Sequence, residues 1–249
     1  MNCHRLISVL MGVLALAGAG FAQGTPNPKW TGQISGGWTS TRGNSITDSL
    51  SASISAEKRW EMDRISLGAD YANERQTVGG VKTTSADWWR AMGKYDYFFD
   101  AQWYGFGNAR YESDKIALLD YRLTLGAGLG YQLMDNDRTS LSLEAGLAHQ
   151  TEEFNTTPGT RNDQVTGQAG YKLTHQIVDT VKLIHDLTYY PSLEGRVSDY
   201  YLTTSGELRA NFTETMFSSF KAILNHDATP AAGQAQTDTK YIVSVGVTF

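Results

Sequence analysis

The last nine residues of the chain, 241–249, alternate between two kinds of side chain. Tyr241, Val243, Val245, Val247 and Phe249 are aromatic or β-branched, and the residues between them from Ser244 on are small or polar. Successive side chains of a β-strand point to opposite sides, so this pattern predicts a strand with one apolar face. That face would pack against a second layer in a soluble sheet, or meet lipid in a transmembrane barrel. The rest of the chain must decide between the two.

From Trp30 onward the chain divides into segments of alternating hydrophobicity. We count about twelve, each roughly ten to fifteen residues long, which is the length that a tilted membrane strand requires. The clearest, residues 119–133, has apolar or aromatic residues at odd positions and polar residues or Gly between them. Connections are short after the even segments and mostly longer after the odd ones. The longer loops are expected at residues 75–84, 152–161, 191–198 and 228–238. This organisation predicts an all-β fold, an antiparallel transmembrane β-barrel of about twelve strands with short periplasmic turns.

The fifth segment, residues 102–112, fits this pattern least well. Tyr104 and Phe106 share a phase with Arg110 and Glu112, so apolar and charged side chains would point the same way. A β-bulge between them would reset the alternation.

An aromatic final residue after alternating apolar positions resembles the C-terminal signal of outer-membrane barrels, which hands them to their assembly machinery. We therefore predict an assembly signal formed by Tyr241, Val243, Val245, Val247 and Phe249. The expected partners are outer-membrane lipid and the barrel assembly machinery. We expect a monomer in the cell outer membrane.

Residues 1–22 have the organisation of a secretory signal peptide. An apolar run at residues 6–16 follows a short basic start, and residues 20–22 form a cleavage site with small residues at both ends. The run is too short to span a bilayer. We expect the mature chain to begin near Gln23, and since the only cysteine is Cys3, it would have no disulfide and no lipid anchor.

Composition excludes several other classes. The net charge is −5 and the chain has no basic block, which argues against nucleic acid as a partner. After the signal peptide no stretch of about 20 apolar residues occurs, which excludes membrane-spanning helices. Composition does not shift along the chain, so residues 23–249 are expected to form one barrel domain.

Aromatic residues cluster at the two ends of the expected strands, as in the girdles of membrane barrels. The expected periplasmic group is Trp60, Tyr97, Phe99, Trp103, Tyr131, Phe212, Phe217 and Phe249. The expected outer group is Trp38, Tyr71, Trp89, Tyr121, Tyr189, Tyr201 and Tyr241. Aromatics flank strands in any β-protein, but the expected outer face carries few charges, which favours girdles.

The opposite phase of the strands carries charges that we place in the lumen. The main predicted lumen charges are Arg90, Lys94, Asp96, Asp120, Arg122, Glu144, Lys172, Asp186, Glu207 and Arg209. The same phase also holds Arg59, Arg110, Lys182, Lys221, Glu57, Asp70, Glu74 and Glu112. The two signs balance, so the charges must be paired or hydrated. Pairing would plug the barrel and hydration would leave a narrow pore; the sequence leaves both open.

Catalytic and metal sites have little support. His149, His185 and His226 share the lipid-facing phase, and some outer-membrane lipid hydrolases present a His/Ser pair on the barrel exterior. However, no Ser lies two residues from any of them. No metal-ligand spacing occurs, and the glycines of residues 126–130 more simply make room for bulky inward side chains. We predict no catalytic residues, no cofactor and no metal.

Several motifs occur in a specific order along the chain: Gly43-Asn44-Ser45, Tyr104-Gly105-Phe106-Gly107, residues 110–114, Asp120-Tyr121-Arg122, residues 126–131 and Glu144-Ala145-Gly146. With these the chain resembles the YdiY-like family of salt-induced outer-membrane proteins, a domain of unknown function, over residues 36–249. The resemblance implies an outer-membrane β-barrel and implies no catalytic residue, cofactor or substrate.

Three functions remain open. The first is a narrow pore for small hydrophilic solutes, with a role in osmotic or salt stress suggested by the family name alone. The second is a lipid-active outer-membrane enzyme that uses His185. The third is a structural or adhesive surface protein that uses residues 75–84 and 228–238 as loops. A secreted soluble β-sandwich or lipocalin-like barrel is the alternative fold, and it would place the apolar residues inside.

Overall fold

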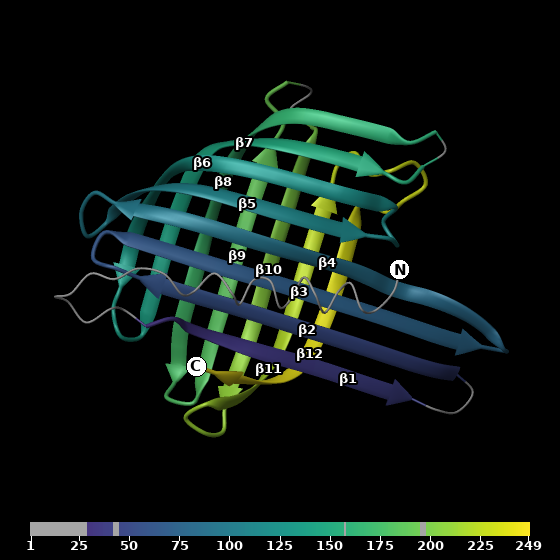
Figure 1. The fold of residues 1–249 in the computed structure, drawn as a ribbon, viewed down its shortest axis with the longest axis horizontal. Coiled ribbons are helices and arrows are strands. Elements are labelled where there is room, and N and C mark those ends of the chain that lie inside the picture. Colours follow the sequence, from purple (N-terminus) through teal and green to yellow (C-terminus); the bar gives the residue numbers. More distant parts are fainter. Residues whose placement is uncertain (1–28, 42–44, 157, 195–197) are drawn as a thin grey trace, which may run out of the picture.

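The computed structural model describes residues 29–41, 45–156, 158–194 and 198–249, which form a closed antiparallel barrel (Figure 1). Its strands are β1 (Thr31–Thr41), β2 (Ser45–Arg59), β3 (Asp63–Val78), β4 (Val81–Phe98), β5 (Trp103–Asp114), β6 (Leu119–Asp135), β7 (Thr139–Phe154), β8 (Thr160–Val178), β9 (Val181–Pro191), β10 (Tyr200–Asn211), β11 (Met216–Asp227) and β12 (Thr237–Thr248). Each strand pairs with its neighbours in sequence, and β1 pairs with β12 to close the ring. The predicted fold class is confirmed. Among the described residues, no helix is long and apolar enough to cross a membrane.

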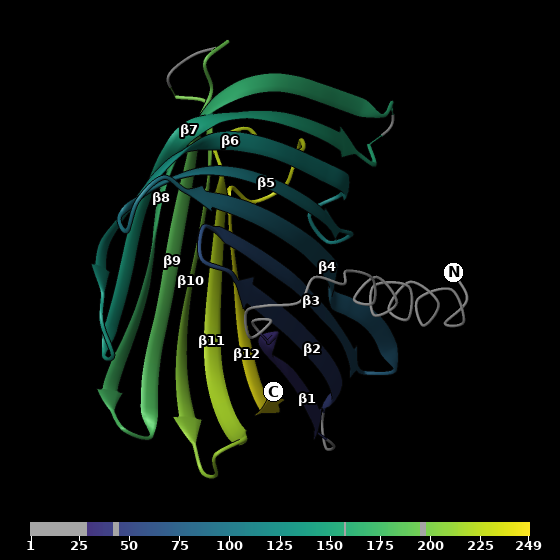
Figure 2. The ribbon, with the colours of Figure 1, turned by 60° about the vertical axis from the view of Figure 1, so that its left-hand side comes forward.

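Apolar side chains cover the outside of the barrel and charged ones face its interior. Val243 is 69% exposed and Leu125 is 49% exposed, whereas Arg122 is 5% and Glu207 is 8% exposed. This is the reverse of a soluble β-sandwich or lipocalin-like barrel and is the arrangement of a barrel that crosses a membrane. The wall formed by β1–β6 faces the wall formed by β9–β12 across the lumen (Figure 2).

The connections at the rim where β1 begins and β12 ends are short, and the two longest, residues 192–199 and 228–236, lie at the opposite rim. Since periplasmic turns are shorter than outer loops, the rim where β1 begins is the periplasmic one. Two expected outer loops are wrong in extent. The loop expected at residues 152–161 lies between Phe154 and Thr160 only, and residues 75–84 continue β3 and β4 as a hairpin. Only Gly79 and Gly80 form its turn, with φ of 58° and 82°, a conformation that glycine adopts without a Cβ clash.

The alternation of β5 continues without a bulge between its aromatic and its charged residues. The bulge that the sequence predicts there is therefore wrong. Tyr104 and Phe106 face the lumen with Arg110 and Glu112, and they are 0% and 5% exposed. A Cβ on Gly130 of β6 would lie 2.1 Å from Cζ of Tyr104. The prediction that inner glycines make room for bulky side chains is confirmed at this position.

A bulge does occur where β5 and β6 meet the outer rim, and it moves one predicted lumen residue. The register of β6 shifts between Leu119 and Tyr121. Leu119 therefore turns inward and is 5% exposed, while Asp120 is exposed. The prediction that Asp120 lies in the lumen is wrong, because the extra residue reverses the alternation at this point.

Most of the aromatic residues predicted for the girdles agree with the structure, and the prediction is wrong for two of them. At the periplasmic rim Phe99, Trp103 and Phe212 are exposed, as are Trp38 and Tyr241 toward the outer rim. In contrast, Phe217 is 0% and Tyr201 is 3% exposed. Both rings lie in the lumen against arginine guanidinium groups, Phe217 near Arg209 and Tyr201 near Arg122.

Candidate functional site: the charged lumen

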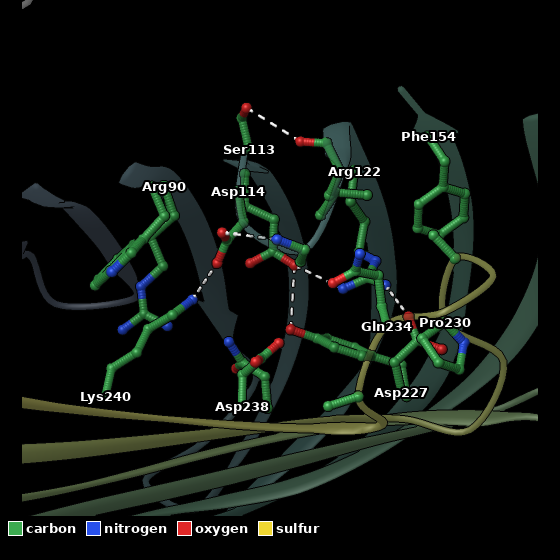
Figure 3. A pocket seen from close by; sticks show the side chains of 18 of the residues that line it. Arg90, Ser113, Asp114, Arg122, Phe154, Asp227, Pro230, Gln234, Asp238 and Lys240 are labelled. Carbon is green, nitrogen blue, oxygen red and sulfur yellow. Dashed lines mark hydrogen bonds and ion pairs between the residues drawn. The ribbon is translucent and has the colours of Figure 1, made fainter. Parts of the chain in front are cut away.

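Arg122 on β6 is the centre of an ion-pair cluster in the outer half of the lumen (Figure 3). Its Nε contacts Glu152 on β7, and its Nη1 lies 3.1 Å from Oε1 of Glu112 on β5. Its Nη2 reaches across the lumen to Asp227 on β11. The guanidinium carbon lies 3.9 Å from the ring centroid of Tyr201 on β10. One buried cation thus joins four other strands.

Glu112 extends this cluster to the opposite wall. It lies 3.0 Å from Nη2 of Arg110 and accepts a hydrogen bond of 3.1 Å from the hydroxyl of Tyr201. Arg110 also donates to Oγ1 of Thr203 on β10 at 3.3 Å. The charges are two arginines against Glu112, Glu152 and Asp227, so the cluster has a net negative charge.

A cavity of about 60 Å³ lies beside this cluster at the outer mouth. Lys240 on β12 forms one of its sides, with Nζ 2.6 Å from Oδ2 of Asp114 and 4.5 Å from the ring of Trp88. The loop of residues 228–236 covers the cavity from outside, and Pro230 and Gln234 of this loop line it (Figure 3). A cavity of this size holds a few water molecules, since one water needs about 10–15 Å³.

Ala231 fixes this loop to the barrel. It is 7% exposed and packs in an apolar cluster with Leu119 and Phe154. Residues 228–236 therefore fold over the mouth, which differs from the freely exposed loop that an adhesive function would use.

Asp70 on β3 is the centre of a second cluster, halfway along the lumen. Its Oδ2 lies 2.7 Å from Nε of Arg90, and its Oδ1 lies 3.2 Å from Nζ of Lys221 on the facing strand β11. Ser53 donates a further hydrogen bond of 2.8 Å to it. Asp70 is 5% exposed, so this carboxylate is buried only because cations and a hydroxyl satisfy it.

Asp96 and Glu144 hold a third cluster near the periplasmic mouth. Asp96 pairs with Arg64 and with Lys94, in both cases at 2.7 Å. Lys94 also contacts Glu144 on β7. The hydroxyl of Tyr104 donates to Glu144 at 2.7 Å, which connects this cluster to the aromatic rings of β4 and β5.

The structure brings half of the ten main predicted lumen charges into these clusters, namely Arg90, Lys94, Asp96, Arg122 and Glu144. Glu207 and Arg209 form a separate pair at 2.9 Å on β10. Lys172 and Asp186 face each other in the register of β8 and β9, but no ion pair joins them. The described lumen thus contains both paired charges and charges in no ion pair, such as Lys172 and Asp186.

Sequence reasoning missed several members of the clusters, namely Arg64, Asp114, Glu152, Asp227 and Lys240. Arg64 is the first residue of an expected strand and has its inward phase, but it is not among the predicted lumen charges. The other four lie in an expected loop or just beyond the expected end of a strand, and they have the inward phase once that strand is extended by one or a few residues. The usable signals are therefore the phase for Arg64 and the strand length for the other four.

His149, His185 and His226 lie on the barrel exterior, as their phase predicted. The ring of His185 stacks on Tyr171 with centroids 5.5 Å apart, and its Nδ1 lies 3.0 Å from the Tyr171 hydroxyl. His149 lies 3.4 Å from Oγ1 of Thr151, whose hydroxyl donates to Asp163. The use of His185 by a lipid-active enzyme stays a prediction. In the part of the chain that the structure describes, no group of three or more His, Cys, Asp or Glu fits a metal ion.

The five residues of the predicted assembly signal lie on one exposed stripe of β12 and at the chain end. Tyr241 is 71% and Phe249 is 56% exposed. The backbone of Phe249 exchanges two hydrogen bonds with Gly32, which continues the short β1–β12 ladder to the periplasmic rim. Recognition by the assembly machinery stays a prediction. The predicted signal peptide lies outside the described residues.

Solved structures with a similar fold include two outer-membrane proteins. The NanC porin is 11% identical, with a TM-score of 0.50 over 89% of this chain and 99% of that one. The translocator domain of the autotransporter NalP from Neisseria meningitidis is 13% identical, with a TM-score of 0.49 over 99% of this chain and 94% of that one. At such identities the likeness concerns the fold alone. No curated protein matches the sequence.

The fold is that of an outer-membrane β-barrel, and with its apolar exterior it confirms the predicted location in the outer membrane. The match to a family covers residues 34–249. The link to salt-induced proteins is a separate matter and stays a prediction. The chain belongs to the family described as protein of unknown function, DUF481.

Proposed function

We propose that this barrel is a narrow pore for small hydrophilic solutes, and that the ion pairs across its lumen hold it closed at rest. The observation that carries the proposal is the contact between Arg122 on β6 and Asp227 on β11, which spans the lumen with charged groups. The Tyr201–Glu112 and Lys221–Asp70 contacts span it in the same way.

The charged side chains that fill the lumen favour a lumen that can open to water. Burying an ion pair costs desolvation, and apolar residues of similar volume often stabilise a protein equally well or better. A barrel with only a structural role therefore gains little from a charged filling. If the walls separate, ion pairs become hydrated, whereas an apolar plug would expose apolar surface to water.

Asp227→Asn tests the proposal. The amide removes the negative charge opposite Arg122, while Glu112 and Glu152 still neutralise the guanidinium, so the barrel keeps its fold. In planar bilayers we expect brief unitary openings for the unchanged protein, and a severalfold higher open probability for the variant. Asp163→Asn is the matched control, because Asp163 lies on the exterior and pairs with Arg161. Absence of unitary conductance in all three proteins would refute the pore.

Salt sensitivity is the finer part of the proposal, and it agrees with the resemblance to salt-induced proteins. Dissolved ions screen charges within about 8–10 Å at 0.1–0.15 M ionic strength. Ions outside the cell can reach the contact of Arg122 with Asp227 at the outer mouth, because the Asp227 side chain is 18% exposed. We expect open probability to rise with salt for the unchanged protein and to depend less on salt for Asp227→Asn. If the open probability does not depend on salt, the proposed salt sensitivity is refuted and the proposed pore is unaffected.

A further inference from the structure

Lumen cations near the periplasmic mouth differ in whether a carboxylate neutralises them. Arg64 and Lys94 share Asp96, and Lys94 also contacts Glu144. Arg59, the last residue of β2, has no ion-pair partner within 4 Å in the described chain. Glu57, two residues before it, is already bound by the hydroxyl of Ser66 at 3.1 Å.

An aromatic ring holds the Arg59 guanidinium in place. Its carbon lies 3.5 Å from the centroid of Phe98, a ring that is 3% exposed. Phe98 packs on Tyr104 with centroids 4.9 Å apart, and the hydroxyl of Tyr104 is fixed by Glu144. The support under Arg59 is therefore a packed and hydrogen-bonded part of the lumen wall.

Stacking leaves the edge of the guanidinium available. The N–H donors of arginine lie in the plane of the group, so contact with a ring face occupies none of them. Arg59 is exposed at the mouth, and a ligand can reach these donors from the periplasm. Lysines 172 and 182 also lack an ion pair in the described lumen, but no ring contact orients their ammonium groups.

The unpaired guanidinium of Arg59 and its cationic neighbour favour an anion as the ligand. Arg64 lies 5.2 Å from the same Phe98 ring, so two guanidinium groups share it. Asp96 and Glu144 already bind Arg64 and Lys94, and no described carboxylate lies within 4 Å of the Arg59 guanidinium. Asp135, Glu57 and Asp96 act on Arg59 through longer-range attraction alone.

We propose that Arg59, stacked on Phe98, forms a binding site for the oxyanion group of a small solute, a carboxylate or a phosphate, at the periplasmic mouth. A planar carboxylate accepts two parallel hydrogen bonds from the edge of a guanidinium, which a chloride ion cannot do. The site can bind its ligand whether or not the lumen conducts.

Binding is measured on the full chain folded in detergent, by saturation-transfer NMR with acetate and by ³¹P line broadening with inorganic phosphate. We expect Arg59→Gln to bind acetate about tenfold more weakly, since a charge-assisted hydrogen-bonded pair is lost. Lys58→Gln is the matched control, because Lys58 is the adjacent cation, belongs to the opposite face and lies over Trp60 at the barrel exterior. Arg59→Lys keeps the charge but loses the paired donors, so it should recover only part of the affinity.

Two further experiments distinguish a lipid headgroup from a free solute as the source of the anion. Nanodiscs with anionic phospholipid should weaken acetate binding if lipid headgroups occupy the site, and nanodiscs with zwitterionic lipid should not. Binding unchanged in Arg59→Gln, lost equally in Lys58→Gln, or absent in the unchanged protein would overturn the proposal. These results are independent of conductance, so the anion site and the pore can fail separately.

Discussion

Lys221 on β11 and Asp70 on β3 meet across the lumen, with Nζ and Oδ1 3.2 Å apart. They are 151 positions apart in the sequence, and their strands share no ladder. Asp70 also pairs with Arg90 on the adjacent strand β4. Side-chain ion pairs therefore hold the two walls at a fixed distance, in addition to the constraint that strand number places on barrel width.

Replacing Asp70 should destabilise the barrel strongly. Arg90 and Lys221 have no other ion pair within 4 Å in the described lumen, so Asp70→Asn leaves two largely buried cations unpaired. We expect the free energy of unfolding to fall by about 3 kcal/mol, measured by urea titration in lipid vesicles. Asp163→Asn, at a side chain that is 42% exposed, should cost less than about 1 kcal/mol. Equal losses would contradict a structural role of the buried pairs.

An arginine on the lipid-facing surface should be costly in proportion to its depth. Leu125, near the middle of β6, is 49% exposed, and Met62, in the periplasmic turn before β3, is 43% exposed. We expect Leu125→Arg to lower the free energy of unfolding by about 2–4 kcal/mol and Met62→Arg by about 0–1 kcal/mol. The same vesicle titration checks this. Similar values for both would mean that Leu125 faces water.

The turn between β4 and β5 gives a pH-dependent contribution. Asp100 accepts hydrogen bonds from the backbone N–H of Trp103 and of Gln102, both at 2.7 Å, and these bonds lower the pKa of its carboxyl below the usual value. A lowered pKa in the folded state means stability that is present at neutral pH and is lost as pH falls through the carboxyl range. Asp100→Ala should therefore be less stable than the unchanged protein at pH 7, and the difference should shrink near pH 3. A difference that does not change with pH would exclude ionised Asp100 as its cause.

Much of the fold follows from the sequence because a period of two is a strong signal over long strands. The alternation of residues 119–133 predicts β6, and the terminal residues predict β12. Two features do not follow. The bulge that turns Asp120 outward depends on the ladder with β7, and the partner of Asp70 depends on which strands face each other. The lumen position of Tyr201 does follow from its phase, which it shares with Glu207 and Arg209 on β10. Local alternation carries no information about contacts across a lumen.

The role of the last residue in assembly can be separated from its role in the girdle. Phe249 and Phe212 are both 56% exposed at the periplasmic rim, and only Phe249 ends the chain. If the terminal aromatic is an assembly signal, Phe249→Ala should reduce the heat-modifiable, membrane-inserted fraction several times more than Phe212→Ala. Both variants refolded in detergent should have similar stability, because each loses one exposed ring. Equal insertion of the two in cells would contradict the signal.

The loop of residues 228–236 should leave the outer mouth when its apolar contact is broken. Ala231 packs against Leu119 and Phe154, and a glutamate there would place a charge in a contact that is 7% exposed. We expect Ala231→Glu to increase protease cleavage within the loop by about tenfold or more, since cleavage follows the population of the open form. Ala232→Glu is the control, because Ala232 is exposed and its side chain makes no such contact. If both variants are cleaved equally fast while their barrels stay folded, Ala231 does not fix the loop, and closure of the outer mouth must depend on the ion pairs of Arg122 and Lys240 alone.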